Sequence, residues 1–178
     1  MSDHGSDAWP PAPVRTARLV LRESEARDRA AVIDLFASPE VGTYIGGARE
    51  REELERTMSE TPGRRPGLFV VELDGAMIGI VTLDRRDPEH PRRVRPEGPE
   101  TELGYMFLPH AWGHGYATEA CAAALDWCAE ARAGEPVVLS TQVANAPSRR
   151  VALKLGFTEV ERFEEYGAEQ WFGVRHPA

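Results

Sequence analysis

The sequence has few cysteines, no long apolar run and no excess of positive charge. Its two cysteines in 178 residues, Cys121 and Cys128, lie on one predicted helix, where we expect small core residues rather than a disulfide or a metal pair. No apolar run approaches the length that crosses a membrane, and the polar, proline-containing N-terminus lacks the apolar core of a signal peptide. We therefore expect a cytoplasmic protein with no metal and no membrane partner.

The charge balance narrows the class of partner. A net charge of −8 argues against general binding to nucleic acid, whose phosphates attract basic surfaces. The same charge suits a cationic acceptor such as an amine. It is equally well explained by solubility alone.

The length predicts one domain with a sizeable core. Residues 1–14 are polar, small and proline-rich, so we expect a disordered leader there and a single domain over 15–178. Strand signals outnumber helix signals and the two are mixed in order, which predicts the α+β class. The clearest hairpin joins Leu68–Leu73 to Ala76–Leu83 through Asp74-Gly75.

One stretch carries the strongest chemical signal. Thr101–Leu108 has the apolar and aromatic character of a buried strand, and Pro109 ends it. Gly113 and Gly115 then allow a sharp turn, and a helical pattern begins near Tyr116. The first turn of a helix presents free N–H groups and the positive end of the helix dipole, so this stretch suits a diphosphate.

Two familiar phosphate loops are excluded here. A Walker loop needs Gly-Lys-Ser/Thr, which does not occur, and a dinucleotide fingerprint needs a third small residue where this chain has Thr118. A plain tight turn stays open as an alternative at this level.

The motifs resemble those of a known superfamily. WGHGYATEA after ELGYMFLP is similar to the acetyl-CoA-binding motif of the GNAT acyl-CoA N-acyltransferases, and most similar to the RimJ/RimL branch. The superfamily pattern Arg/Gln-x-x-Gly-x-Gly/Ala falls on Trp112 to Ala117, with Trp112 departing from it. ARLVLRE, SPEVGTYIGG and NAPSRRVALKLGF resemble three further segments of that branch, so the resemblance runs from about Thr16 to Trp171.

The resemblance implies a fold and a donor. It implies a mixed, mostly antiparallel sheet of about six or seven strands, flanked by helices and splayed at its centre after a bulge. It implies acetyl-CoA as donor co-substrate without a metal, and direct transfer of the acetyl group to a primary amine. The residues it places at the donor are Met106, Phe107, Leu108, Gly113, His114, Gly115, Tyr116, Ala117, Thr118, Asn145 and Arg149, largely through their backbone.

Two residues are candidates for proton handling. Glu102 on the central strand shares a face with Gly104 and Met106 and is our candidate base, the alternative being an exposed strand carboxylate in a cross-strand pair. Ser148 matches the serine of the N-x-x-S pattern, which implies a role at the departing thiolate; a first-turn hydroxyl without a chemical role is the alternative. Tyr105 and Tyr166 remain weaker candidates.

The sequence says least about the amine that accepts the acetyl group. The resemblance places Tyr44 and Ile45 in the wall of the acceptor site, although a packing role explains them equally well. A protein N-terminus, an amino acid, a polyamine or an aminoglycoside all present an amine. A homodimer is compatible with the family, and the arginine-rich segment 85–99 is expected to be an exposed, mobile loop. The rival function is a non-catalytic acyl-CoA sensor or scaffold.

Overall fold

A single twisted sheet organises the molecule. The computed structural model describes residues 9–177, and within that range it contains eight strands in the order β1-β2-β3-β4-β5-β6-β8-β7. They are β1 (Val14–Arg15), β2 (Val20–Arg22), β3 (Leu68–Leu73), β4 (Ala76–Arg85), β5 (Thr101–Phe107), β6 (Val137–Gln142), β7 (Thr158–Glu165) and β8 (Ala168–Arg175). The α+β class is confirmed, with one strand more than the upper expectation.

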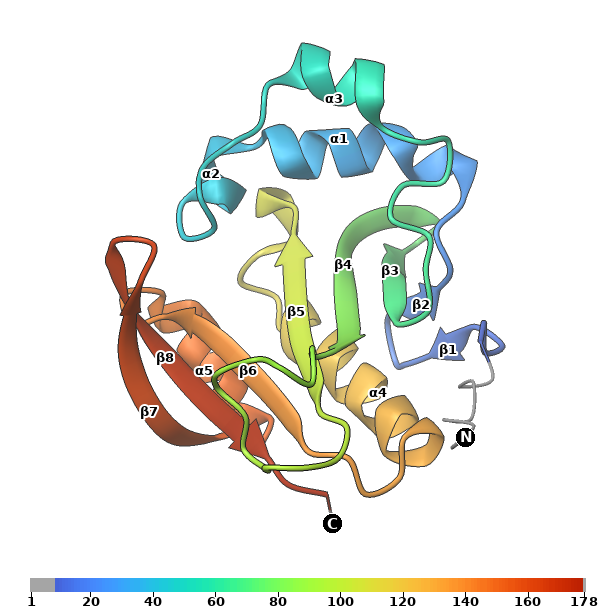
Figure 1. Ribbon diagram of the computed structural model, residues 1–178. Coiled ribbons are helices and arrows are strands. Elements are labelled where there is room, and N and C mark those ends of the chain that lie inside the picture. The colour runs from blue at the N-terminus through green and yellow to red at the C-terminus, as the bar shows by residue number, and fades with distance from the viewer. Residues whose placement is uncertain (1–8, 178) are drawn as a thin grey trace.

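The sheet opens at its centre. All neighbouring strands are antiparallel except β5 and β6, which run parallel and pair only at Thr101–Val137 and Glu102–Val138. Beyond Glu102 the two strands diverge, and Figure 1 shows a gap between their upper ends. The predicted splay is therefore confirmed. The expected bulge in β5 is absent from its ladder with β4, which runs without a break from Gly79–Phe107 to Arg85–Thr101.

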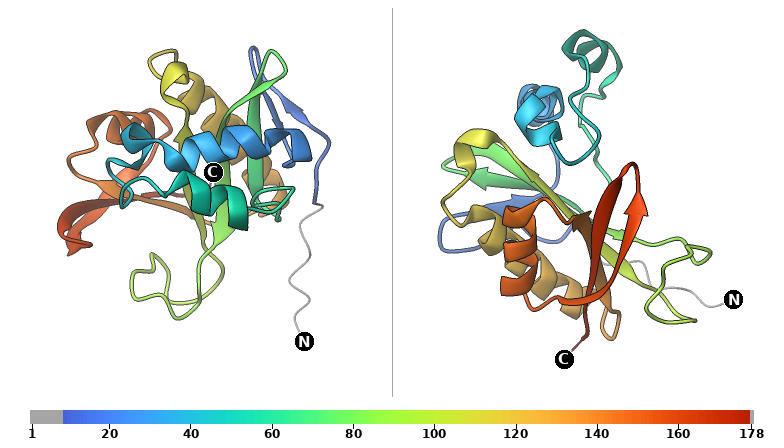
Figure 2. Two further views of the ribbon diagram at one scale, coloured as in Figure 1. Left: turned by 90° about the horizontal axis from the view of Figure 1, so that it is seen from above. Right: turned by 90° about the vertical axis from the view of Figure 1, so that its left-hand side faces the viewer.

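Helices cover the sheet on opposite sides. The helices α1 (Arg29–Ala37), α2 (Pro39–Gly42) and α3 (Arg51–Thr57) cross the upper end of the sheet, while α4 (Tyr116–Ala131) and α5 (Ala146–Lys154) lie behind it in Figure 1. The two further views in Figure 2 show the same separation. Short 3-10 turns, η1 (Ala26–Asp28) and η2 (Pro109–Ala111), precede α1 and follow β5.

The two faces of the sheet have separate cores. The predicted apolar face of α4 is buried against one face, with Ala120, Ala124, Leu125 and Cys128 all nearly inaccessible. On the other face, Val32 and Leu35 of α1 pack against β3 and β4. The two faces can therefore carry different chemistry beside the same gap.

Local turn chemistry matches the sequence at the hairpins. Asp74 and Gly75 both have positive φ, 51° and 83°, the geometry of the tight hairpin turn that Asp-Gly favours. The β7–β8 hairpin turns in the same way at Tyr166 and Gly167, with φ of 53° and 75°. The predicted hairpin at Asp74-Gly75 is confirmed.

The segment before β1 packs on the domain. Trp9 makes edge contacts with Phe69 and Trp127, at ring-centroid distances of 5.1 and 5.6 Å. The expected leader covers residues 1–14, of which 1–8 lie outside the described residues. The remaining part includes Trp9, so the ordered structure begins before the expected boundary.

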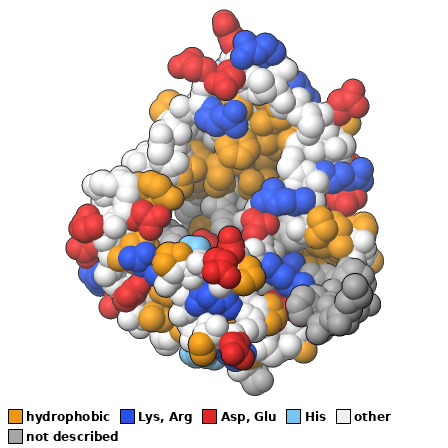
Figure 3. Space-filling model, viewed as in Figure 1, with side chains coloured by type: hydrophobic (Ala, Val, Ile, Leu, Met, Phe, Trp, Pro, Cys, Tyr) orange, Lys and Arg blue, Asp and Glu red, His pale blue; other side chains and the backbone are white. Residues whose placement is uncertain are grey.

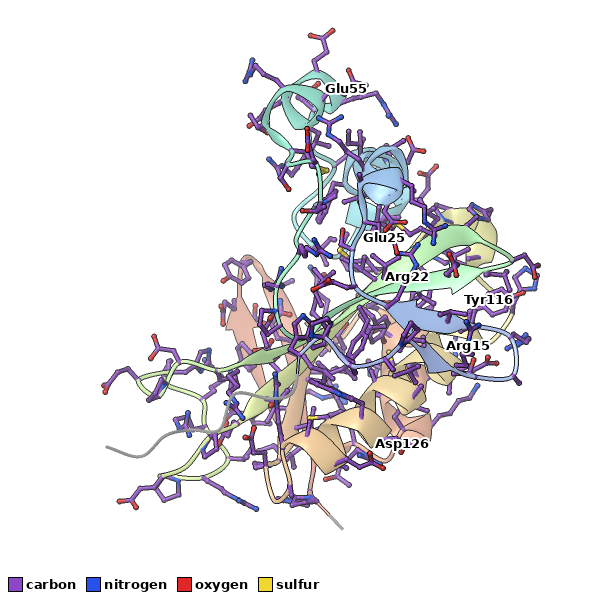
Figure 4. All side chains as sticks on the ribbon, turned by 90° about the vertical axis from the view of Figure 1, so that its right-hand side faces the viewer. Arg15, Arg22, Glu25, Glu55, Tyr116 and Asp126 are labelled. Atoms are coloured by element: carbon purple, nitrogen blue, oxygen red, sulfur yellow. The ribbon has the colours of Figure 1, made fainter. Side chains whose placement is uncertain are left out.

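A buried ion pair ties the start of α1 to the sheet. The guanidinium of Arg22 donates to both carboxylate oxygens of Asp28 at 2.8 and 2.9 Å, and both side chains are almost inaccessible. Figure 4 shows Arg22 and Glu25 at this junction. Within residues 9–177, no helix is long and apolar enough to cross a membrane.

Candidate active site

The turn between η2 and α4 is open to solvent. Gly113 and Gly115 have φ of 79° and 80°, a region that side chains other than glycine rarely occupy. A Cβ added at Gly113 would meet no atom within 4 Å. The indole of Trp112 donates to the carbonyl of Phe107 at 2.8 Å and so fastens the turn to the end of β5.

The turn also has unused hydrogen-bond donors. Among the described residues, no acceptor takes the backbone N–H groups from Gly113 to Thr118; the first donor in use is Glu119, which bonds the Gly115 carbonyl. Free N–H groups at a helix N-terminus favour an anion. These residues therefore fit a diphosphate.

Arg18 adds a positive charge beside this turn, and the sequence reasoning missed it. Its Nε lies 2.8 Å from Glu119 Oε1, and its Nη1 donates to the carbonyl of His114 at 3.0 Å. The guanidinium also lies over the ring of Tyr116, 4.4 Å from its centroid. No sequence pattern links positions so far apart, and only the fold brings them together.

Peptide groups line the gap between β5 and β6. Leu108 donates to Ile78 in β4, and hydrogen bonding alternates along an antiparallel strand, so Met106 also faces β4. The peptide groups of Tyr105 and Phe107 point the other way, into the gap. The N–H of Leu108 is thus already bonded to β4 and Met106 faces the same way, so Phe107 is the best placed of the three for a donor in the gap. The roles of Met106 and Leu108 at the donor stay predictions.

The N-terminus of α5 lies on the α4 side of the gap. Ser148 occupies its first turn, where its N–H donates to the Asn145 side chain at 3.3 Å, so Asn145 is the N-cap. The Ser148 Oγ lies 2.7 Å from the phenol oxygen of Tyr105. Arg149 donates to the carbonyl of Val143 at 3.1 Å, and its Nε is buried without a partner among the described residues.

Glu102 lies on the opposite face, at the closed end of the gap. It lines a pocket of about 280 Å³ together with Thr82, Asp84, Arg85, Arg86 and Gly104. Its carboxylate lies 3.2 Å from Arg86 Nε, and its side chain is 42% exposed. Glu102 therefore has an arginine partner and also faces a pocket, and its role as a base stays a prediction.

The segment after β4 is anchored through buried charge. Arg86 is 3% exposed and lies 3.6 Å from Glu100, whose side chain is inaccessible. Glu100 accepts from the N–H groups of Val94 and Arg95, both at 2.8 Å. Arg92 lies over the ring of Phe163 at 3.5 Å. Most residues of 87–99 are exposed or half-buried, as expected, but these contacts fasten the segment to β5 and β7.

The segment that contains Tyr44 and Ile45 contacts the end of β6. The carbonyl of Tyr44 accepts from the Gln142 side chain at 3.1 Å, and Ile45 is 56% exposed. Figure 3 shows this face hollowed between α1–α3 above, the β7–β8 hairpin at one side and the segment 86–99 below. Hydrophobic side chains gather on the upper wall of the hollow, and charged ones lie along its lower rim.

The fold thus assembles the predicted residues around one gap. The open turn lies at its wide end, Ser148 lies on one face and Glu102 on the other at its narrow end. His114 stays on the exposed side of the turn, stacked with Tyr116 at 5.4 Å between ring centroids. A carboxylate and a hydroxyl on opposite faces of the sheet beside this gap can serve as proton acceptor and hydrogen-bond donor for one transfer reaction.

Comparisons with known proteins agree with this geometry. Residues 18–158 match the family model described as an acetyltransferase (GNAT) domain. The uncharacterized protein YkkB of Bacillus subtilis (strain 168) is 30% identical, over 79% of this chain and 82% of the relative. The L-amino acid N-acetyltransferase AaaT of Escherichia coli (strain K12) is 26% identical, over 82% and 85%. The ribosomal L7/L12 α-N-protein acetyltransferase RimL, solved with coenzyme A, has the same fold with a TM-score of 0.71 and 15% identity, over 93% of this chain and 98% of that one.

Proposed function

Because the chain belongs to the GNAT acetyltransferase family and is an acetyl-CoA-dependent N-acetyltransferase, we propose that it transfers the acetyl group directly to a primary amine bound in the hollow of the α1 face. The observation that carries the proposal is the parting of β5 from β6 beyond Glu102, the carboxylate that also lines the pocket beside β4. The donor supplies an acetyl thioester, and the chain supplies the groups that hold and polarise it.

The residues present fit the donor. The free N–H groups of Gly113 to Thr118 would hold its diphosphate, with the Arg18 guanidinium at the edge of the same turn. The peptide groups of Tyr105 and the N–H of Phe107 would hold its amide-containing arm, and a backbone N–H there would polarise the thioester carbonyl. One such donor is typically worth about 3–4 kcal/mol in a transition state. The buried, unpartnered Nε of Arg149 is a further donor on the α5 side.

Glu102 would accept the proton of the amine. An amino terminus has a pKa near ~8 and a lysine near ~10.4, so the acceptor is mostly protonated at neutral pH and must lose a proton before it attacks. Glu102 lines the pocket beside β4 and lies at the residue pair where β5 and β6 part, which is where the reacting carbonyl would be bound. Arg86 fixes the orientation of this carboxylate through the contact at 3.2 Å.

Ser148 would stabilise the departing thiolate. Its hydroxyl lies on the face opposite Glu102, so the amine would arrive from one side of the gap and the sulfur would leave on the other. A serine hydroxyl is a poor acid, so a hydrogen bond is a better description of its role than full proton transfer.

Direct transfer is favoured over an acetyl-cysteine route. Cys121 is fully buried in the α4 core, and burial raises the pKa of its thiol. A neutral buried thiol is a poor nucleophile, because the thiolate is the reactive form.

We infer the class of amine acceptor from the hollow on the side of the sheet that α1 covers. Its charged lower rim would receive the amine, and its apolar upper wall would receive the rest of the molecule. One relative is named an L-amino acid N-acetyltransferase and one structural neighbour an α-N-protein acetyltransferase, and both kinds of substrate carry an α-amine. We therefore place amino acids and peptide N-termini ahead of polyamines and aminoglycosides.

An acceptor screen tests this function. The full chain is incubated with acetyl-CoA and equal concentrations of free amino acids, short peptides, spermidine and an aminoglycoside, and acetylated products are identified by mass. We expect acetylation of α-amines bearing an apolar side chain. Binding of acetyl-CoA without acetylation of any amine would instead support the acyl-CoA sensor or scaffold. A homodimer is a further proposal, although the charged side chains of the edge strand β7 disfavour pairing of two copies along that edge.

A further inference from the structure

We propose that Tyr105 is a positioning residue for Ser148. Its phenol donates a hydrogen bond to Ser148 Oγ, and the hydrogen of the serine is then free to point into the β5–β6 gap toward the departing sulfur. This inference rests on the proposed role of Ser148 and extends it to a residue on a different element.

The geometry supplies the contact. Tyr105 comes from β5 and Ser148 from the first turn of α5, and their side-chain oxygens are 2.7 Å apart. The phenol also lies 3.3 Å from the Ser148 carbonyl. An O–H···O bond is best near 2.7–2.8 Å and weak beyond about 3.0 Å, so the hydroxyl oxygen is the better of the two acceptors.

Two arrangements of the hydrogens differ in what they leave for a ligand. If Ser148 donates to Tyr105, the serine hydrogen is used within the protein. If Tyr105 donates to Ser148, the serine oxygen accepts one bond and its own hydrogen is available for a negatively charged partner. A hydroxyl that accepts one hydrogen bond also becomes a better donor, because the two bonds polarise one another. A developing thiolate therefore selects the second arrangement.

Tyr105 would hold its proton throughout. Burial raises its pKa to about 12, while an ordinary thiol has a pKa of about 8.5. Moving the proton from the phenol through Ser148 to the thiolate is unfavourable by a factor of about a thousand or more, from this difference in pKa. Tyr105 and Ser148 therefore supply hydrogen bonds and do not transfer a proton to the sulfur. The proton that is transferred in the reaction passes from the amine to Glu102.

The experiment is a double-mutant cycle. Tyr105→Phe, Ser148→Ala and the double variant are compared with the parent in kcat, in KM for the acceptor and in acetyl-CoA affinity by calorimetry. Tyr105→Phe keeps the ring in the core and removes one oxygen, so the variant is expected to fold. Thr57→Val is the control, because it also removes one hydroxyl, and that exposed hydroxyl donates to the Glu53 carbonyl within α3.

The expected results separate this inference from the proposed function. Tyr105→Phe should lower kcat about 5- to 10-fold, the worth of one hydrogen bond, with acetyl-CoA affinity unchanged. The double variant should be no slower than Ser148→Ala, since Tyr105 acts only through the serine. The ratio of parent to Tyr105→Phe should stay constant from pH 6 to pH 9, as the phenol keeps its proton.

Other results would overturn it. Equal kcat for Tyr105→Phe and the parent, additive losses in the double variant, or a ratio that changes across this pH range each exclude the positioning role. An unchanged kcat for Ser148→Ala would exclude the role assigned to Ser148, and with it this inference. Absence of acetyl transfer by the parent chain is a separate outcome and would count against the proposed function itself.

Discussion

The Nε of Arg86 lies 3.2 Å from Oε2 of Glu102, so a buried guanidinium holds the carboxylate at the narrow end of the β5–β6 gap. Arg86 also contacts Glu100, the His90 ring and the carbonyl of Arg92. The residue next to the reacting groups is therefore fixed by the same arginine that fastens the segment 86–99. Changes at Arg86 should consequently affect both stability and activity.

The first prediction concerns the glycine turn. Gly115→Trp should abolish acetyl-CoA binding, because an indole at this position would occupy the open turn next to Arg18 Nη2, which lies 3.5 Å from an added Cβ. Calorimetry measures the affinity. Gly134→Trp is the control, since Gly134 has a φ of 81° and an added Cβ there meets nothing within 4 Å, but it lies after α4. Retained binding in Gly115→Trp would remove the turn from the donor site.

The second prediction concerns the base. Glu102→Gln should lower kcat/KM for the amine by about 100-fold or more, the usual contribution of a general base, with acetyl-CoA affinity unchanged. The control is Glu169→Gln, another strand carboxylate beside an arginine, 3.6 Å from Arg162 and 50% exposed. Equal losses in both variants would mean that Glu102 is only a cross-strand partner.

The third prediction concerns Arg86. Arg86→Met should destabilise the fold by up to about 3–5 kcal/mol, because it removes the nearer of two arginines beside the inaccessible carboxylate of Glu100 and leaves only Arg93, at 4.0 Å. Denaturant unfolding measures the free energy. Adding Glu100→Gln removes the stranded charge, so the double variant should regain much of the lost stability. A double variant as unstable as the single one would show that the ion pair is not the cause.

The fourth prediction concerns pH. Burial alone would raise the pKa of Asp28, but hydrogen bonds from Arg22 and from the Glu25 N–H outweigh it and hold that pKa below its ordinary value. A carboxyl whose pKa is lowered by folding stabilises the fold above its unfolded pKa of about 3.9, and this stability is lost as the pH falls further.

Asp28→Asn should therefore cost about 3 kcal/mol or more at pH 7, and the difference from the parent should shrink below about pH 4. Asp34→Asn is the control, because its ion pair with Arg51 is exposed and is expected to contribute at most about 1 kcal/mol. A difference that persists unchanged at pH 2–3 would contradict this explanation.

The fifth prediction concerns the cysteines. Cys121→Ala should retain most of the activity, and intact-protein mass spectrometry during turnover should detect no acetylated enzyme, since the thiol is buried and its pKa is raised. The thiol should also resist alkylation until the protein unfolds. An acetyl-enzyme that disappears when amine is added would exclude direct transfer.

Local signals in the sequence predicted a large part of this structure. The Asp74-Gly75 hairpin, the buried face of α4 and the helix start after Gly115 all follow from neighbouring residues and were confirmed. The two-residue strand β1 was missed, because its pairing with β2 is too short to give a periodic pattern.

Contacts between segments far apart in the sequence were not predicted. Nothing in the sequence places Arg18 beside His114, Arg86 beside Glu102, or Tyr105 beside Ser148, because each pair depends on how strands and helices pack. The direction in which the backbone groups of Met106 and Leu108 point was not predictable for a related reason. The choice between odd and even positions of β5 is set by its register with β4, which the sequence does not reveal.

The narrow junction of β5 and β6 has a consequence for thermal behaviour. The two halves of the sheet are joined there by only two residue pairs, so few main-chain bonds resist their separation. A molecule bound along the gap would bridge both halves and complete the hydrogen bonding of their facing edges. The melting temperature of this protein should therefore rise steadily as the concentration of acetyl-CoA is raised above its dissociation constant.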